Sequence, residues 1–218
     1  MRAQDAASPH SPGPLFIIGC GRSGTTLLRL MLNAHSAFAI PEESHFIYHL
    51  ARDRAAGRYR KGLNDEKTWA ALLDYFENHS FVQRWGLAMP ALMARLRALP
   101  QHSFKHVFAT IFAAYREQQG KPLWGDKTPM HVNYMFLVRR FFPNARFLHI
   151  IRDGREVAMS LLTRTWGPRH INHAGYYWKW LVLAGLVGGH LMGPARYRQI
   201  RYEDLVRDPE GVLRAVSA

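Results

Sequence analysis

The sequence predicts an α/β fold in which helices flank a mainly parallel central sheet. Short apolar runs alternate with longer segments of good helix formers, which is the pattern of layered α/β proteins. The first apolar run leads into a glycine-rich turn and then a helix, as at the start of a β–α–β unit. With 48% hydrophobic and 21% charged residues, the 218-residue chain has ordinary globular composition, so wholesale disorder is excluded. We expect one domain over residues 15–218, preceded by a flexible Pro/Ser/Gly leader at residues 1–14.

The individual elements follow from the same patterns. The run Leu15–Ile18 is continuously apolar, which is typical of a strand buried on both faces. Strands are predicted at 15–18, 37–40, 123–124, 146–151 and 197–202. Helices are predicted at 25–34, 156–165 and 173–192. The region 45–120 should be mostly helical, with breaks near Gly57, Gly62, Pro90 and Pro100.

The net charge and the cysteine content limit the classes of ligand and cellular compartment that the sequence suits. The net charge of +13 could serve nucleic acid, an acidic substrate or several phosphates on one ligand. The arginines are scattered and no run of basic residues stands out, so we predict no nucleic-acid partner. The single cysteine excludes a disulfide framework and suits a reducing compartment. The apolar stretch 181–192 is too short for a bilayer, so a cytoplasmic protein without a membrane partner is expected, with a homo-oligomer left open.

Polar and reactive side chains follow every predicted strand. Open parallel sheets bind ligands outside the carboxyl ends of their strands. We therefore expect one shared cleft that contains these side chains, although loops are polar in any protein. In chain order the five groups are Arg22 with Ser23, Glu42 with Glu43, Asp126 with Lys127, Arg152 with Asp153, and Glu203 with Asp204.

The loop from Gly19 to Thr26 has the frame of a phosphate-binding P-loop. Its backbone amides and the following helix N-terminus would cradle an anion. The lysine of a Walker A motif is absent because Thr25 stands in its place, which argues against an ordinary ATPase or kinase. Arg22 inside the loop instead offers a forked donor to a phosphate or sulfate oxygen.

A second anion site is predicted around Arg152. Ser160 and Arg164 are four residues apart on a predicted helix and so share one face. With Arg152 at the preceding strand end, they would provide two guanidinium groups and a hydroxyl for a separate phosphate. A surface helix with unrelated arginines is the alternative interpretation.

Together these segments resemble a known family. GCGRSGTTLLRLML is similar to the 5′-phosphosulfate loop of sulfotransferases that use 3′-phosphoadenosine 5′-phosphosulfate (PAPS), and RDGREVAMSLLTR is similar to their 3′-phosphate segment. PEESHF, GDKTP and RYEDLVRDPEGVL extend the resemblance, which is closest to tyrosylprotein sulfotransferases and their bacterial relatives. The resemblance implies a P-loop-type three-layer fold. It also implies that the C-terminal part of the family domain is missing here, because family members usually continue beyond this point.

The resemblance also implies roles for individual residues. Glu43 would be the general base, with Glu42 as the rival in the same segment, and Lys127 and Arg22 would steady the sulfuryl group and leaving phosphate. The acceptor hydroxyl could belong to a tyrosine, a sugar or a small alcohol or phenol, and the region 45–120 would face it. The residues implied to bind PAPS are Arg22, Ser23, Gly24, Thr25, Thr26, Arg152, Ser160, Arg164 and Tyr202.

Other interpretations stay open. A degenerate P-loop kinase and a non-catalytic protein that binds a nucleotide or polyanion are the rival functions. The pairs His45/His49 and His102/His106 have metal-ligand spacing but lack an HExxH motif, so no metal is predicted. The aromatic cluster Tyr176, Tyr177, Trp178 and Trp180 is expected to be helix packing, and Cys20 a small loop residue rather than a nucleophile.

Overall fold

A computed structural model describes residues 13–217 of the chain. The leader predicted at residues 1–14 therefore lies almost wholly outside the described residues. Within the described range the chain forms one sheet whose neighbouring strands all pair in parallel. The strands are β1 (Leu15–Gly19), β2 (Phe38–Ala39), β3 (Leu123–Lys127), β4 (Arg146–Ile151) and β5 (Tyr197–Arg201).

The strand order is β2-β3-β1-β4-β5, so β1 lies at the centre. In register, Ile17 lies beside Lys127 of β3 and Leu148 of β4. Every carboxyl end of the parallel strands therefore reaches the same edge of the sheet. The α/β class predicted from the sequence is confirmed, and the strand at 146–151 has the predicted bounds.

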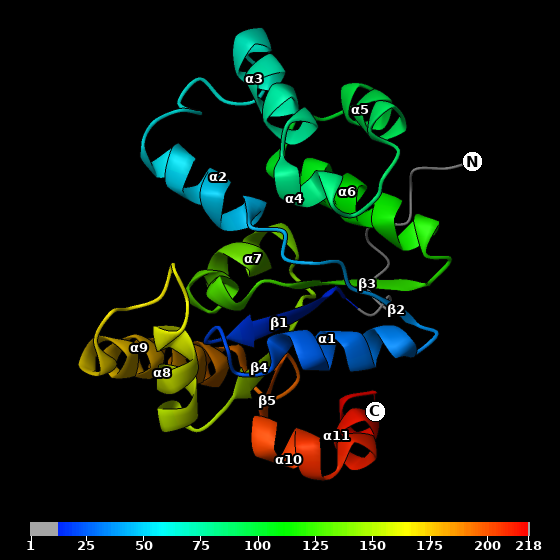
Figure 1. Cartoon of the computed structure of the whole chain (residues 1–218). Helices are drawn as coiled ribbons and strands as arrows, with labels where there is room; N and C mark the ends of the chain where they lie inside the picture. The colour runs from blue at the N-terminus through cyan, green and yellow to red at the C-terminus, as the bar shows by residue number, and fades with distance from the viewer. Residues whose placement is uncertain (1–12, 218) are drawn as a thin grey trace.

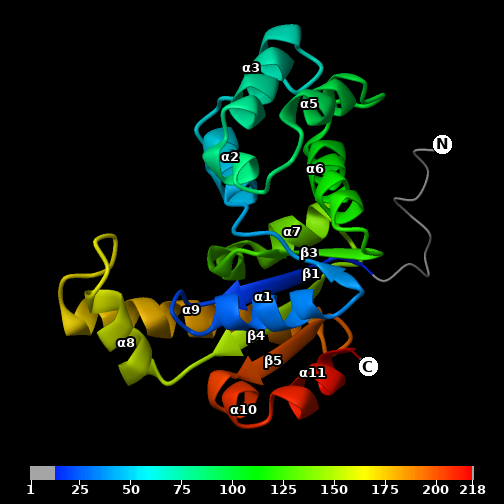
Figure 2. The ribbon, with the colours of Figure 1, turned by 45° about the vertical axis from the view of Figure 1, so that its right-hand side comes forward.

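Helices cover both faces of the sheet, as Figures 1 and 2 show. In Figure 1, α10 and α11 lie below the sheet and the group α2 to α6 lies above it, and α1 shares an apolar core with α10. The helices are α1 (Thr25–Ala34), α2 (Phe46–Ala55), α3 (Glu66–Glu77), α4 (Ser80–Gln83), α5 (Met89–Arg97), α6 (Phe104–Gln118), the 3₁₀ helix η1 (Pro129–Tyr134), α7 (Met135–Phe141), α8 (Gly154–Leu162), α9 (Ile171–Met192), α10 (Tyr202–Arg207) and α11 (Pro209–Ser217).

Two apolar cores lie on opposite faces of the sheet. Successive residues of a strand point to opposite faces, so β1 contributes to both cores. Phe16 and Ile18 belong to the larger core, which includes the helices from α2 to α9. Leu15 and Ile17 belong to the smaller core with α1, β5 and α10. The continuous apolar run of β1 is therefore needed because neither face of that strand meets water.

Several predicted bounds are wrong in detail. Strand β3 extends to Lys127, so Asp126 and Lys127 are its last two residues rather than the loop after it. β2 contains two residues instead of the four predicted over 37–40. The predicted break near Pro90 is confirmed, because α4 ends at Gln83 and α5 begins at Met89, with Pro90 in its first turn, where a missing N–H costs nothing.

Glycines bring α9 close to the sheet. A Cβ on Gly185 would overlap the ring of His149, and a Cβ on Gly189 would overlap the ring of Tyr197. The hydroxyl of Tyr197 lies 2.6 Å from Nδ1 of His149, so these two rings form a polar pair beneath the helix. Burial lowers the pKa of His149 to about 4. Within residues 13–217 no helix is both long and apolar enough to cross a membrane.

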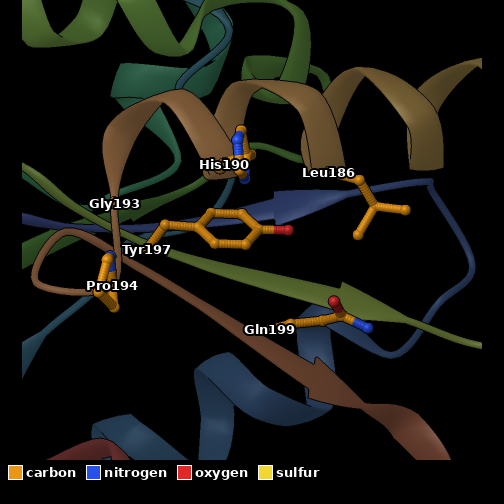
Figure 3. A pocket seen from close by; sticks show the side chains of 7 residues that line it. Leu186, His190, Gly193, Pro194, Tyr197 and Gln199 are labelled. Carbon is orange, nitrogen blue, oxygen red and sulfur yellow. The ribbon is translucent and has the colours of Figure 1, made fainter.

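The clearest cavity is not beside the polar strand ends. A cavity of about 320 Å³ lies between the end of α9 and the start of β5, lined by Leu186, His190, Tyr197 and Gln199 among others (Figure 3). It opens where β5 begins, whereas the carboxyl ends of the strands lie at the opposite edge. A second cavity, of about 300 Å³, is lined by Arg152, Asp153 and Trp178 and so adjoins the strand ends.

Candidate functional site

The glycine-rich loop between β1 and α1 has a conformation that depends on its glycines. Gly24 has φ 94°, a left-handed conformation that glycine adopts without steric cost. The ring of Tyr202, from the start of α10, packs on Gly24 so closely that a Cβ there would overlap it. Arg22 also has a positive φ, of 74°. Positive φ values are uncommon for residues with a β-carbon and cluster at functional sites.

The loop leaves several hydrogen-bonding groups without protein partners. The N-cap residue of α1, Gly24, provides no side-chain cap, so the first amides of that helix remain free to bind an anion. The hydroxyl of Ser23 is fully buried, and among the described residues it has no hydrogen-bond partner. Buried polar groups are nearly always satisfied, so the loop fits an oxygen-rich ligand such as a phosphate or sulfate.

Arginines from two separate segments meet beside this loop. Nε of Arg22 donates to Oγ of Ser160 at 2.9 Å, and Arg152 donates to the carbonyl oxygen of Arg22 at 3.4 Å. Burial together with the charges of Arg164 and Arg152 lowers the pKa of Arg22. The structure therefore brings together the two anion sites that the sequence predicted separately.

The predicted helix placement of Arg164 is wrong. α8 ends at Leu162, so Arg164 lies in the turn that follows and does not share a helix face with Ser160. Its charge nevertheless acts on Arg22. Proximity therefore arises from the turn after α8 and not from helical periodicity.

Aromatic residues hold Arg152 from two sides. Its guanidinium lies 4.5 Å from the ring centre of Tyr202, and its carbonyl oxygen accepts a hydrogen bond of 3.1 Å from the indole of Trp178. The expectation that the α9 aromatics are packing residues holds for Trp178. It is wrong for Tyr176 and Trp180, which are 71% and 66% exposed.

Lys127 connects the loop to the acidic segment after β2. Its Nζ donates to Oε1 of Glu43 at 2.7 Å and to Oγ1 of Thr26 at 3.4 Å. The Lys127 side chain is only 6% exposed, so its ammonium is held between these two partners. Glu42, the rival base, is exposed, and the structure gives it no such contact.

Glu43 is held as a carboxylate. Nε2 of His45 lies 2.9 Å from its second oxygen, Oε2. Burial on its own would raise the pKa of Glu43, but the hydrogen bond from His45 and the charge of Lys127 outweigh it and lower that pKa to about 2. Both oxygens thus have a partner while the side chain remains 32% exposed.

A buried polar network fixes the segment that contains Glu43. The hydroxyl of Ser44 donates to Oδ2 of Asp126 at 3.0 Å, and the amide of Ser44 donates to Oγ1 of Thr128 at 3.0 Å. Nδ1 of His131 lies 2.9 Å from Oδ2 of Asp126, but it is out of line for a hydrogen bond. All of these side chains are fully buried. Ser44, Thr128 and His131 were not predicted as site residues, and the contacts of Ser44 join segments more than 80 residues apart.

The histidine pairs have other partners. His45 contacts Glu43 and Tyr48, and Nδ1 of His49 lies 3.4 Å from the hydroxyl of Tyr75. His102 stacks on Trp69 at 4.0 Å between ring centres. Among residues 13–217 no three His, Cys, Asp or Glu side chains are grouped as metal ligands. Burial raises the pKa of Cys20 to about 12, which is far from that of a reactive thiolate.

Sequence comparison places this arrangement among known proteins. The model of the Sulfotransferase family matches residues 14–218. Protein-tyrosine sulfotransferase 2 of Gallus gallus is 28% identical over 93% of the chain and 49% of its own length. Protein-tyrosine sulfotransferase A of Caenorhabditis elegans is 24% identical over 100% of the chain and 52% of its own length. The chain thus spans about half the length of these curated relatives.

Solved structures agree with the sequence comparison. The sulfotransferase domain of the curacin biosynthetic pathway is 25% identical with a TM-score of 0.64, covering 94% of this chain and 72% of that one. The sulfotransferase domain of the Synechococcus PCC 7002 olefin synthase is also 25% identical, with a TM-score of 0.60 over 96% of this chain and 74% of that one. The P-loop-type three-layer fold expected from the sequence is therefore confirmed. The chain belongs to the sulfotransferase family.

Proposed function

We propose that this protein transfers a sulfuryl group from PAPS to an acceptor hydroxyl, with Glu43 as the general base. The observation that supports this most directly is the position of Lys127. One ammonium contacts both Thr26 of the glycine loop and Glu43, so the donor loop and the base lie within reach of the same charge. In-line transfer needs the nucleophile and the leaving group on opposite sides of the transferred group, with both activated in one site.

The donor would occupy the two anion sites. The loop amides, Ser23 and Arg22 would hold its 5′-phosphosulfate, which supplies the sulfuryl group. Arg152, Ser160 and Arg164 would hold its 3′-phosphate, next to the ring of Tyr202. These residues suit a ligand with two anionic groups, because Arg22 and Arg164 form no ion pair within residues 13–217 and can pair with the ligand. Burial is the main cause that lowers the pKa of Arg22, and the nearby charges of Arg164 and Arg152 lower it further.

The acceptor would be activated by the other group of residues. Glu43 accepts the proton of the acceptor hydroxyl as its oxygen forms the new bond to sulfur. Lys127 and Arg22 stabilise the charge that grows on the leaving phosphate. When Lys127 turns to that phosphate, Glu43 loses the positive charge that lowers its pKa and becomes a stronger base. α2 begins three residues after Glu43, and Phe81 of α4 packs on His45, so we assign acceptor selectivity to the region of α2 to α6.

The proposal is tested by binding and transfer together. Calorimetric titration should show tight binding of 3′-phosphoadenosine 5′-phosphate and much weaker binding of 5′-AMP and Mg-ATP. Transfer of ³⁵S from labelled PAPS is then measured against tyrosine peptides, sugars and small alcohols or phenols. Glu43→Gln should retain nucleotide affinity and lower the rate by roughly 10²- to 10⁴-fold, the usual contribution of a general base.

Glu42→Gln is the matched control, because the neighbouring carboxylate is exposed and should leave the rate unchanged. Loss of transfer in Glu42→Gln alone would assign the base to Glu42. Nucleotide binding without transfer to any acceptor, insensitive to Glu43→Gln, would instead indicate a non-catalytic binding protein. Turnover of Mg-ATP would indicate a degenerate P-loop kinase.

A further inference from the structure

The imidazole of His45 lies between Glu43 and Tyr48. Its Nε2 is 2.9 Å from Oε2 of Glu43, and its Nδ1 is 2.9 Å from the hydroxyl oxygen of Tyr48. We propose that His45 is a positioning residue that fixes the Glu43 carboxylate, and that Tyr48 fixes the tautomer of His45. The inference rests on the proposed role of Glu43 as base. His45 itself has no contact with the glycine loop in the structure.

The hydrogen-bonding groups of Glu43, His45 and Tyr48 determine where each proton lies. A carboxylate only accepts hydrogen bonds, so Nε2 of His45 donates to Glu43. In the neutral imidazole Nδ1 then accepts, and the hydroxyl of Tyr48 is its donor. One neutral tautomer satisfies both contacts. His45 thereby occupies Oε2 and leaves Oε1, the oxygen beside Lys127, as the one that can turn to an acceptor hydroxyl.

The surroundings hold the imidazole in this position. The ring of Phe81 lies 4.2 Å and the ring of His49 lies 5.9 Å from the ring of His45, measured between centres. Tyr48 is in turn stacked on Tyr134 at 6.0 Å. The charged groups that act on Tyr48 are Glu43 and Arg52, and burial is the main reason that its pKa is raised. A raised pKa keeps the phenol protonated, as a donor to His45 must be.

The backbone at His45 is strained in a way that a merely structural residue would avoid. His45 has φ 55° and ψ −26° at the N-cap of α2, a left-handed conformation with a steric cost for any residue bearing a β-carbon. The preceding residue, Ser44, is locked by its buried bonds to Asp126 and Thr128. Asparagine or glycine would relieve the strain, yet the position holds a histidine whose side chain reaches back to Glu43.

Two amide substitutions separate positioning from structure. In His45→Gln the side-chain amide reaches approximately as far as Nε2 and can still donate to Glu43. In His45→Asn the shorter amide replaces Nδ1 and cannot reach Glu43. Asparagine, however, is the better tolerated residue at positive φ. A positioning role therefore predicts that His45→Gln is more active but less stable than His45→Asn. A structural role predicts instead that the more stable variant is also the more active one.

We measure kcat, KM for PAPS and the thermal midpoint for both variants and for Tyr48→Phe. We expect kcat to fall about 10- to 100-fold in His45→Asn, since misplacement of a reacting group by about 1 Å has effects of this size. It should fall only a few-fold in His45→Gln and in Tyr48→Phe. KM for PAPS and the affinity for 3′-phosphoadenosine 5′-phosphate should stay unchanged in all three, because none of these residues contacts the loop.

The inference is overturned if His45→Asn and His45→Gln have equal kcat, or if their kcat values follow their thermal midpoints. The proposed function is tested separately by Glu43→Gln with His45 intact. If Glu43→Gln retains full transfer, the proposed function fails whatever His45 does. If Glu43→Gln abolishes transfer and His45→Asn does not lower it, only the present inference fails.

Discussion

The two halves of the site balance their charges in opposite ways. On the donor side, which comprises the glycine loop, Arg152, Ser160 and Arg164, three arginines act on one another's charge, and only Arg152 has an acidic partner, Glu156 at 3.1 Å, among residues 13–217. On the acceptor side, which comprises Glu43 to Tyr48, each oxygen of the central carboxylate has a donor. The donor side is therefore short of negative charge, whereas the acceptor side is already neutralised.

This difference indicates what each half does when ligands arrive. Clustered cations stabilise a bound anion and destabilise the empty protein, so the donor side should gain free energy when a bisphosphate binds. The acceptor side must instead give up a contact before Glu43 can receive a proton. Lys127 belongs to both halves, because it contacts Thr26 and Glu43.

Lys127→Met should have the largest effect, since it disables both halves. The substitution removes the charge available to the leaving phosphate, and loss of one such donor costs roughly 10²- to 10³-fold in kcat. It also removes the charge that holds down the pKa of Glu43, so an acid limb should appear in the pH profile of kcat as that pKa moves back toward its ordinary value. Stopped assays between pH 4.5 and 8 measure both effects.

Lys121→Met is the matched control. Lys121 precedes β3, and its ammonium donates to the carbonyl oxygen of Asn33. The same substitution at Lys121 therefore leaves the site intact. Its kcat and pH profile should match those of the wild type. If Lys127→Met keeps the wild-type pH profile, Glu43 and Lys127 are not coupled and the division described above is wrong.

Arg152→Ala should affect the donor side alone. A charge-assisted hydrogen bond contributes about 1.5–3 kcal/mol, so affinity for 3′-phosphoadenosine 5′-phosphate should fall roughly 10- to 100-fold. Affinity for 5′-AMP, which lacks the 3′-phosphate, should change little. Calorimetry measures both ligands, with Arg155→Ala as the control because that arginine is 90% exposed and pairs with Asp153. Equal losses for both ligands would remove Arg152 from the 3′-phosphate site.

The separate segments of the donor side could be predicted from the sequence because each segment is local. Gly19 to Thr26 is one continuous strand–loop–helix segment, and the distance along the chain from Arg152 to Ser160 spans one strand end and one helix. Local geometry places the groups within each segment, whereas the contacts of Arg22 with Ser160 and Arg152, which lie 138 and 130 residues apart along the chain, depend on the tertiary fold. Even here the prediction failed at Arg164, because the helix ends three residues earlier than predicted, although Arg164 still lies near Arg22.

The acceptor side could be predicted only in part. The sequence singled out Glu43 and Lys127, but the contacts of Ser44 with Asp126 and Thr128 join segments 82 and 84 residues apart. His45 was considered only as one half of a metal pair. The spacing to His49 is correct for a helix. The partners of an imidazole, however, depend on tertiary packing, which cannot be predicted from the periodicity of the sequence.

Gly185→Ala tests the scaffold shared by both halves. A Cβ at this position would overlap the ring of His149, and such overpacking of a core costs about 1–3 kcal/mol. Gly175→Ala in the same helix is the control, because a Cβ there meets nothing within 4 Å. It should stabilise the protein by about 0.5–1 kcal/mol through helix propensity. Urea unfolding measures both, and a destabilised Gly175→Ala would contradict the assigned packing of α9.

Acidification should have the smallest effect on the free energy of unfolding, and that effect comes from two buried histidines in different parts of the protein. Burial lowers the pKa of His149, beneath the donor side, and that of His79, at the start of α4, to about 4 each. A histidine with a lowered folded pKa binds its proton more readily when unfolded. Its stabilising contribution is therefore complete above pH 6.5 and is lost as the pH falls toward 4, by about 1 kcal/mol per group between pH 7.5 and 5.5.

The two histidines can be distinguished by substituting each in turn. In His149→Gln the unfolding free energy should be lower at pH 7.5 but should fall less on acidification, because one of the two protons taken up on unfolding has been removed. His79→Gln should reduce the pH dependence by a similar amount, and His190→Gln, at an exposed position, should leave it unchanged. Glu43 has an ordinary pKa of 4.5 when unfolded and about 2 when folded, so its own contribution is lost only as the pH falls through that lower range and adds little between pH 7.5 and 5.5. An unchanged slope in His149→Gln would mean that this imidazole is protonated in the folded protein, and its hydrogen bond to Tyr197 would then need the tyrosine oxygen as acceptor.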